Sequence, residues 1–279
     1  MKSKVIFLDL DGTLVHPDAK ISQKNKEAIL KAKQNGHLVY ICTGRNLCGI
    51  DEELKDMNFD GIISSAGGYI EVENKVIYQS YIEKSMITKI RDVFEKNNIV
   101  YTLEASECSY ATEELTKLFV LGKDVKDMNS EMQRLCNEAK KAFNMRPLEN
   151  YEQEQIGIHK VSFVATNKEQ LVEPKKVLEK DFAFVVHDIF SKETINGEII
   201  DRNTNKATAI YKVLALLNRS IEDTIGFGDS MNDYEMIEAV TIGVAMKNAP
   251  QQLKEVAQYV CKDVREDAIY HEFKRLQLI

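Results

Sequence analysis

The chain has 279 residues, of which 37 are Lys or Arg and 44 are Asp or Glu, so its formal charge is −7. This acidic balance, in a sequence without a basic stripe interleaved with aromatic residues, argues against a nucleic-acid binder. No apolar stretch approaches the roughly 20 residues that a membrane-spanning helix needs, which argues against a membrane protein.

The cysteines and the N-terminal residues bear on the cellular compartment. The five cysteines are scattered and form no CxxC pair, which is typical of reduced thiols and not of a disulfide framework or a zinc site. The first apolar run breaks at Asp9, too early for a signal peptide. These observations predict a cytoplasmic protein.

The first part of the chain alternates predicted strands and helices. Runs at 5–8 and 38–42 are apolar throughout, as in strands that are buried on both faces. Between them, Ser22 and Gly36 are placed to begin and to end a helix, which completes a right-handed βαβ unit. A third strand and a hairpin are predicted further along, at 61–63, 69–72 and 76–78.

The last part of the chain returns to this alternation, whereas the middle departs from it. Elements are predicted in turn at 206–217, 224–227, 231–239 and 242–245, with Pro250 at the start of another helix. The middle mixes longer helical patterns with alternating strands, at 85–96, 130–143, 158–165, 168–180 and 182–187. We therefore expect an α/β, Rossmann-like parallel-sheet core of residues 1–82 and 191–279, with an α+β domain inserted at 83–190.

Polar residues follow three of the predicted core strands. They form the clusters Asp-Leu-Asp-Gly-Thr at 9–13, Thr-Gly-Arg at 43–45 and Gly-Asp-Ser-Met-Asn-Asp at 228–233. The carboxyl ends of parallel strands meet at one edge of a sheet, where open α/β sheets bind their ligands. We therefore expect residues that are distant in sequence to meet in one cleft.

The acidic residues of these clusters predict a cation. Asp9, Asp11, Asp229 and Asp233 would repel one another if brought together, so they need a cation, a shared proton or both. A set of ligands made only of oxygens favours Mg²⁺, which also accepts phosphate oxygens.

Three further groups are candidates for binding phosphate: the Thr43 hydroxyl, the backbone near Gly44, and Lys206. Lys206 falls in the first turn of its predicted helix, where the helix dipole disfavours a cation and a bound anion would reverse the penalty. Taken alone, Lys206 fits an exposed lysine, and the other clusters fit ordinary turns and helix caps. Their joint occurrence favours catalysis.

In this order, the clusters resemble the four motifs of the haloacid dehalogenase superfamily: 9–13, 43–45, Lys206 and 228–233. The insert between the second and third motifs resembles that of the Cof-type phosphatases, which carry a cap domain there. The resemblance covers nearly the whole chain, strongly in the core and in outline in the cap. It departs at Ala66, where many relatives have an Asn-Gly pair, and at Lys247, where glycine is common.

The resemblance implies a role for each motif residue. Asp9 would be the nucleophile that forms an aspartyl-phosphate, and Asp11 would protonate the leaving oxygen and then activate water. The carboxylates of Asp9 and Asp229, with the backbone carbonyl of Asp11, would hold Mg²⁺. Asp233 would orient Lys206 or a metal-bound water. The phosphoryl oxygens would be bound by Thr43, Gly44, Lys206, Asn232 and the Leu10 backbone.

The resemblance thus implies a Mg²⁺-dependent phosphatase for small phosphorylated metabolites, with sugar phosphates first and flavin mononucleotide or pyridoxal phosphate as others. One alternative is a phosphotransferase or mutase that passes the phosphoryl group from the same intermediate to a sugar hydroxyl. Another is a non-catalytic sensor of phosphorylated metabolites. The sensor is disfavoured because a sensor needs no acid or base, whereas the chain carries Asp9, Asp11, Lys206 and Asp229.

Overall fold

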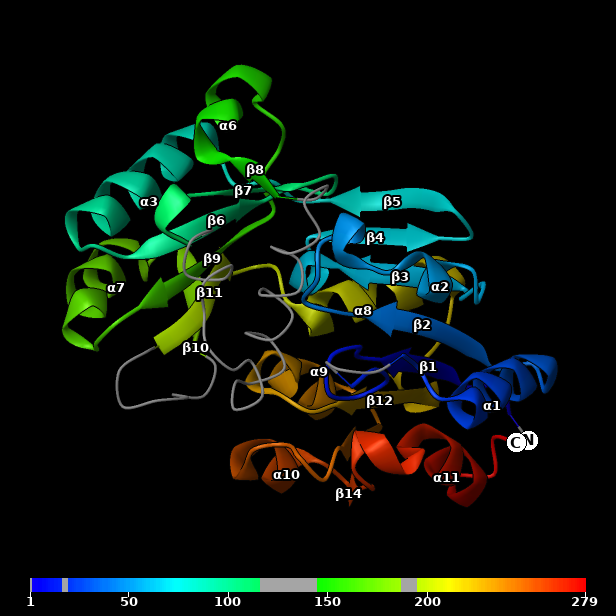
Figure 1. Ribbon diagram of the computed structural model, residues 1–279. Coiled ribbons are helices and arrows are strands. Elements are labelled where there is room, and N and C mark those ends of the chain that lie inside the picture. The colour runs from blue at the N-terminus through cyan, green and yellow to red at the C-terminus, as the bar shows by residue number, and fades with distance from the viewer. Residues whose placement is uncertain (1, 17–19, 116–144, 187–194) are drawn as a thin grey trace. The chain divides into compact units, whose positions relative to one another are not determined.

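The computed structural model describes residues 2–16, 20–115, 145–186 and 195–279, and the predicted helix at 130–143 lies outside them (Figure 1). The chain divides into two compact units. The core unit contains Met1–Gly44, Ile50–Tyr78 and Asn205–Ile279, and the inserted unit contains Arg45–Gly49 and Gln79–Thr204. Each unit is built around its own β-sheet.

The limits of the inserted unit differ from those expected from the sequence. We expected boundaries at 82/83 and 190/191, whereas the chain passes between the units at 78/79 and 204/205. The later limit moves because strand β11 (Ile195–Asp201) pairs with two strands of the inserted unit's sheet. Asn196 and Gly197 interrupt the apolar pattern that would have marked this segment as a strand.

Among the described residues, the core sheet has eight strands in the order β14-β13-β12-β1-β2-β3-β4-β5. The strands from β14 to β3 are parallel, and β4 is antiparallel to β3. Their bounds are β1 (Val5–Leu8), β2 (Leu38–Cys42), β3 (Gly61–Ser64), β4 (Tyr69–Val72), β5 (Lys75–Gln79), β12 (Thr224–Gly228), β13 (Ile242–Ala245) and β14 (Tyr259–Val260). This sheet confirms the predicted α/β class.

Helices cover both faces of the core sheet (Figure 1). On one face, α8 (Lys206–Leu217) and α9 (Tyr234–Ala239) share an apolar cluster with β1 and β2. On the other, α1 (Gln23–Gln34) packs against α11 (Ala268–Arg275), where Phe273 meets Phe227 with ring centroids 5.7 Å apart. Strand β1 is fully buried between these layers, as its unbroken apolar run predicts. The remaining core helices are α2 (Glu52–Lys55) and α10 (Gln251–Val256).

The sheet of the inserted unit has, in the part that the structure describes, six strands in the order β10-β11-β9-β6-β7-β8. Neighbours are antiparallel except for β7 and β8. The bounds are β6 (Val100–Glu104), β7 (Ser109–Ala111), β8 (Met145–Pro147), β9 (Lys160–Ala165) and β10 (Phe182–Val186). An apolar cluster joins one face of this sheet to helices α3 (Lys84–Lys96), α6 (Leu148–Glu154) and α7 (Val172–Leu178).

The predicted core elements are confirmed to within a few residues, and two predicted helices are divided. The helix predicted at 231–239 begins with a 3₁₀ turn, η6 (Met231–Asp233), and the one predicted at 168–180 with η4 (Glu169–Leu171). Further 3₁₀ turns are η1 (Leu47–Gly49), η2 (Ser65–Gly67), η5 (Ile221–Asp223) and η7 (Val264–Glu266). None of the helices within the described ranges has the length and apolar character to cross a membrane.

Candidate active site

The first acidic cluster lies in the loop that leaves β1 at the centre of the core sheet. The backbone N–H of Asp9 donates to the Phe227 carbonyl at 3.0 Å, so Asp9 still belongs to the edge of the sheet. The Leu10 carbonyl then accepts from the backbone N–H of Val15 at 2.8 Å, which closes a tight turn. Asp9 and Asp11 are both 4% exposed, so the turn holds two carboxyl groups in a largely dry site.

Gly12 lets this turn approach the third acidic cluster. Its φ is +80°, in the left-handed region that glycine adopts without strain. A Cβ at this position would lie 2.0 Å from Oδ2 of Asp229, which is closer than any side chain can come. The glycine of the first cluster is therefore required by its backbone angle and by the neighbouring carboxylate.

Lys206 is buried, so the interpretation of an exposed lysine is wrong. It is the first residue of α8, which Asn205 caps by accepting from the Thr208 N–H at 2.8 Å. Only 1% of Lys206 is exposed. Its Nζ donates to Oδ1 of Asp9 at 2.8 Å and to Oδ1 of Asp233 at 2.5 Å. These two carboxylates offset the cost of placing a cation at the N-terminal end of a helix.

Asp233 connects Lys206 to the loop that follows β12. Its Oδ1 accepts from Lys206, and its Oδ2 accepts from the backbone N–H groups of Asp229 and Ser230, at 2.9 Å and 3.1 Å. The loop therefore contains a helix-capping box as well as a carboxylate that orients Lys206. Asn232 lies beside them, with its Oδ1 3.4 Å from Nζ of Lys206.

The structure brings Asp9 and Asp229 together at one possible metal position and adds Asp233. One carboxylate oxygen from each of the three lies within 4.8 Å of the others, and all three residues are buried. These donors are all oxygens, which fits Mg²⁺ and not a softer metal. The ligand set expected from the resemblance contains the backbone carbonyl of Asp11 and not Asp233. Both carboxylate oxygens of Asp233 already accept hydrogen bonds, which agrees with leaving Asp233 out of that set.

The electrostatics of the site also fit a bound cation. Burial, helped by the nearby Asp233 charge, raises the pKa of Asp9 well above its usual value, against the opposing effect of Lys206. Burial alone would lower the pKa of Lys206, but Asp233 and Asp9 outweigh it and hold that pKa well above the usual range. Lys206 thus remains charged. Its single positive charge does not balance the crowded carboxylates, so the site favours an additional bound cation.

The second motif occupies the same edge of the sheet. Strands β1 and β2 are parallel neighbours with Leu8 opposite Ile41, so Thr43 and Gly44 leave the sheet beside Asp9 and Leu10. Leu10, Thr43 and Gly44 are all buried.

The segment around Ala66 supports the second motif. The backbone N–H of Thr43 donates to the Ile63 carbonyl at 2.8 Å, and the backbone carbonyl of Thr43 accepts from the N–H of Ala66 at 3.1 Å. Ala66 has a φ of +54°, the left-handed region that favours Asn or Gly. Its methyl side chain offers no hydrogen-bonding group at this position.

The loop after β13 contributes a residue that was not predicted from the sequence to belong to the site. The Nδ2 of Asn248 donates to Oδ2 of Asp229 at 2.9 Å and to the Gly12 carbonyl at 3.3 Å. It follows β13, and its position at the end of a buried strand was the available signal. Its neighbour Lys247 is exposed and lies 3.6 Å from Oε2 of Glu266.

Comparisons with known proteins agree with this geometry. A family model described as haloacid dehalogenase-like hydrolase matches residues 6–273. A putative phosphatase of Bacillus subtilis (strain 168), YkrA, is 28% identical over 281 residues, and the match covers 100% of each chain. The 5-amino-6-(5-phospho-D-ribitylamino)uracil phosphatase YwtE of the same organism is 28% identical over 288 residues, with 98% of each chain covered.

Two solved structures share the whole fold. A haloacid dehalogenase-like hydrolase from B. subtilis has a TM-score of 0.82 and 25% identity, with 98% of this chain and 99% of that chain covered. The sugar phosphatase BT4131, of haloacid dehalogenase subclass IIB, has a TM-score of 0.78 and 24% identity, with 99% and 100% covered. The likeness extends over both units of this chain.

Proposed function

The chain belongs to the haloacid dehalogenase-like hydrolase family and is a phosphatase, and from that premise we propose a Mg²⁺-dependent hydrolysis of small phosphorylated metabolites through an aspartyl-phosphate on Asp9. One observation carries the proposal: Lys206 is buried between Asp9 and Asp233, beside Asp229. A buried set of one lysine and three carboxylates is costly to fold and matches the needs of phosphoryl transfer.

Asp9 is the nucleophile in this proposal. Its carboxylate attacks phosphorus as the bond to the leaving oxygen breaks, and Lys206 stabilises the negative charge at the reacting centre. Asp11 donates its proton to the leaving oxygen and then takes one from the water that hydrolyses the acyl-phosphate. The two buried carboxyl groups, two residues apart on one turn, thus have different tasks.

The chain's oxygen ligands would hold Mg²⁺ through the carboxylates of Asp9 and Asp229 and the carbonyl of Asp11. When bound, the ion supplies positive charge that keeps Asp9 ionised and shields it from the anionic phosphate. We assign Asp233 to the positioning of Lys206, because its two oxygens accept from Nζ and from two backbone N–H groups. Asn248 would fix the orientation of Asp229 by its hydrogen bond.

The phosphoryl oxygens would be bound by groups at the same edge of the core sheet: Thr43, Gly44, Lys206, Asn232 and the Leu10 backbone. In this proposal the inserted unit is the cap domain that sets specificity, and the enzyme acts on cytoplasmic metabolites. Sugar phosphates are the leading substrates, a choice supported by the phosphorylated ribityl compound in the name of YwtE.

Release of inorganic phosphate from p-nitrophenyl phosphate and from a panel of phosphorylated metabolites tests the proposal. We expect turnover with Mg²⁺, loss of turnover with EDTA and recovery when Mg²⁺ is added back. The Asp9→Asn variant should lose turnover while its circular dichroism spectrum stays unchanged. Turnover by Asp9→Asn, or turnover that EDTA leaves intact, would contradict the assigned nucleophile or the assigned metal.

A further inference from the structure

The core sheet ends, within the described residues, in an edge strand whose side chains are apolar and exposed. Strand β5 is the last strand in the sheet order, beside β4 (Figure 1). Its residues Val76 and Ile77 are 51% and 37% exposed. An edge strand presents backbone N–H and C=O groups to any strand that comes beside it, and proteins usually protect such an edge with Pro, with lysines or with a bulge. Strand β5 contains no Pro and a single lysine, Lys75, at its start.

Helix α8 extends this apolar surface on one face of the sheet. The helix contacts β4, and Nζ of its Lys212 lies 4.6 Å from the centre of the Tyr78 ring in β5. Tyr211 and Leu216 of α8 are 51% and 56% exposed. Four of the nine large apolar side chains that are exposed in the described part of the chain therefore belong to two neighbouring elements. We call these four residues the edge patch: Val76, Ile77, Tyr211 and Leu216.

The sequence of β5 has the same polarity pattern in both directions. It reads Lys-Val-Ile-Tyr-Gln, with three apolar residues between two polar ones. Two copies of the strand can lie antiparallel and be aligned on Ile77. Lys75 of each copy then faces Gln79 of the other, and Val76 faces Tyr78. Like charges that lie directly opposite each other destabilise a strand pair, and this alignment contains none. The strand is therefore complementary to a second copy of itself.

The symmetry of such a pair also brings the two α8 helices together. Antiparallel copies of one strand are related by a two-fold axis perpendicular to the sheet, so both copies of α8 lie on the same face of the joined sheet. Leu216 follows Lys212 by four residues, so both lie on the side of α8 that is next to β5. The helices thus present exposed apolar side chains to each other across the axis.

We propose that the edge patch is a homodimer interface, in which two copies of the chain pair their β5 strands antiparallel around Ile77 and place their α8 helices side by side. The two core sheets then form one continuous sheet. The interface combines main-chain hydrogen bonds between the edge strands with burial of the edge patch. No residue of the candidate active site belongs to the edge patch, so the interface is independent of the proposed catalytic chemistry.

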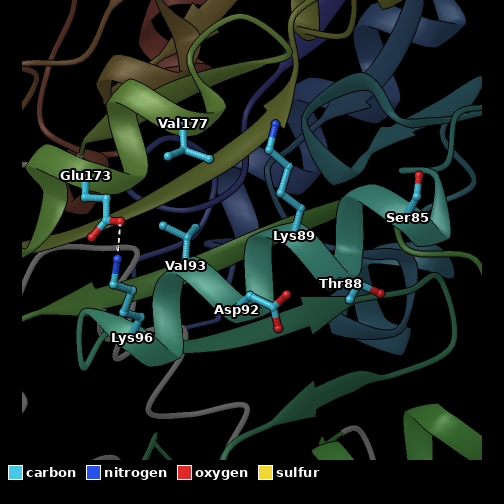
Figure 2. A pocket seen from close by; sticks show the side chains of 8 residues that line it. All are labelled: Ser85, Thr88, Lys89, Asp92, Val93, Lys96, Glu173 and Val177. Carbon is cyan, nitrogen blue, oxygen red and sulfur yellow. Dashed lines mark hydrogen bonds and ion pairs between the residues drawn. The ribbon is translucent and has the colours of Figure 1, made fainter.

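A groove on the inserted unit is the competing contact surface. It lies between α3 and α7 and has a volume of about 380 Å³ (Figure 2). Lys96 and Glu173 form an ion pair across it at 2.6 Å, and Nζ of Lys89 lies 3.7 Å from Oδ2 of Asp181 (Figure 2). These two lysines thus have acidic partners within the unit, which favours the edge patch as the contact surface. Val172, which directly precedes Glu173 and is 66% exposed, supplies a matched control position on this unit.

Sedimentation velocity and light scattering on the full chain measure its oligomeric state. At about 50 µM we expect the wild type to have twice the chain mass of 31.8 kDa. Ile77→Lys places two ammonium groups opposite each other at the centre of the interface and should give a monomer. Val172→Lys adds the same charge at an exposed apolar position outside the edge patch and should leave the dimer intact. A monomeric wild type, or a dimer that Ile77→Lys leaves intact, would overturn the proposal.

Two further variants at the same position test the alignment on Ile77. Ile77→Lys and Ile77→Glu should each be monomeric alone, because the substituted residue faces its own copy, and their mixture should form a heterodimer. Ile77→Cys should form an intermolecular disulfide under mild oxidation, because directly opposite residues have Cα atoms about 4.5–5.5 Å apart. Val76→Cys, which faces Tyr78 instead of its own copy, should cross-link no more than wild type. A mixture that stays monomeric, or equal cross-linking of the two cysteine variants, would overturn the self-pairing of β5.

Measurements of folding and turnover separate dissociation from unfolding. The Ile77→Lys monomer should keep the circular dichroism spectrum of the wild type and its turnover of p-nitrophenyl phosphate within about twofold, because β5 carries none of the acidic residues of the site. Tyr211→Ala removes a large aromatic contact of the helix and should raise the dimer dissociation constant about tenfold. If Ile77→Lys does not fold, the Ile77→Cys cross-link decides: its formation supports the interface, and its absence overturns it.

Discussion

Oδ1 of Asp9 lies 2.8 Å from Nζ of Lys206, although 197 residues separate the two in the chain. The side chain of Lys206 is 0% exposed and that of Asp9 is 5% exposed, so the pair has left water almost completely. A buried ion pair of this kind contributes little net stability, but removing one partner leaves an uncompensated charge. In the proposed mechanism the pair acts on the phosphoryl group, and its burial makes the core unit sensitive to single changes at either residue.

Lys206→Met should destabilise the fold and abolish phosphatase activity. The substitution leaves Asp9 and Asp233 buried without their cation, which costs about 3–5 kcal/mol of unfolding free energy. Lys206 opposes the rise in the pKa of Asp9, so its removal should raise that pKa further in the folded state, and the deficit should shrink as the pH falls and a proton neutralises Asp9. Urea unfolding in Mg²⁺-free buffer at several pH values measures this. Lys212→Met, which removes an exposed lysine of the same helix, is the control.

Asp11→Asn should separate the two halves of the reaction. Transfer of the phosphoryl group to Asp9 needs no acid when the leaving group is p-nitrophenolate, but hydrolysis of the acyl-phosphate needs a base. We expect one burst of p-nitrophenolate per enzyme, followed by turnover that is slower by about a hundredfold or more. Mass spectrometry of the quenched protein should show the phosphorylated form, and its absence would assign the base elsewhere.

Gly12→Ala should damage the site more than the fold. The left-handed backbone costs a non-glycine residue about 1–2 kcal/mol, and the new Cβ would collide with Oδ2 of Asp229. Displacing that carboxylate should lower kcat/KM by about a hundredfold. Gly36→Ala is the matched control, because Gly36 has a φ of +85° and nothing within 4 Å of its Cβ position. It should lose similar stability and keep its activity; equal activity losses would contradict the collision.

The pH dependence of stability should report on Asp223, which directly precedes β12, whereas Asp229 directly follows it. A hydrogen bond from Lys2, with the charges of Lys4 and Arg219, holds the pKa of Asp223 below its usual value. Because the folded-state pKa is depressed, the stabilisation is present above the unfolded value of about 3.9 and is lost as the pH falls through the folded one. Thermal unfolding should show Asp223→Asn to be less stable than wild type at neutral pH, with the difference disappearing in acid. A difference that does not shrink as the pH is lowered would contradict the assignment.

The sequence predicted the core fold well because its strands are buried on both faces. Runs such as Val5–Leu8 and Leu38–Cys42 contain only residues that the sheet interior accepts, so their patterns are unambiguous. The convergence of Asp9 and Asp229 followed from the rule that parallel strands end at one edge. The catalytic roles of these residues stay predictions until the variants are measured.

Features that depend on tertiary partners could not be predicted in the same way. Strand β11 contains Asn196 and Gly197 and is a strand only because β9 and β10 pair with it. Asn248 is one amide among many in the sequence, and its hydrogen bond to Asp229 appears only when β13 and β12 are aligned. The buried group of Glu104, Lys160 and Glu198 likewise requires β6, β9 and β11 to be placed in register.

The pentapeptide Arg45–Gly49 has a consequence for protein engineering. It groups with the inserted unit. There Nδ2 of Asn46 donates to Oγ of Ser109 at 3.0 Å, and the backbone N–H of Cys48 donates to the Ser106 carbonyl at 2.9 Å. Deleting 79–204 and rejoining the chain would remove both acceptors. The loop that directly follows Gly44 would then lose these two hydrogen bonds. A minimal catalytic fragment would therefore need a redesigned loop at 45–49 as well as a new junction.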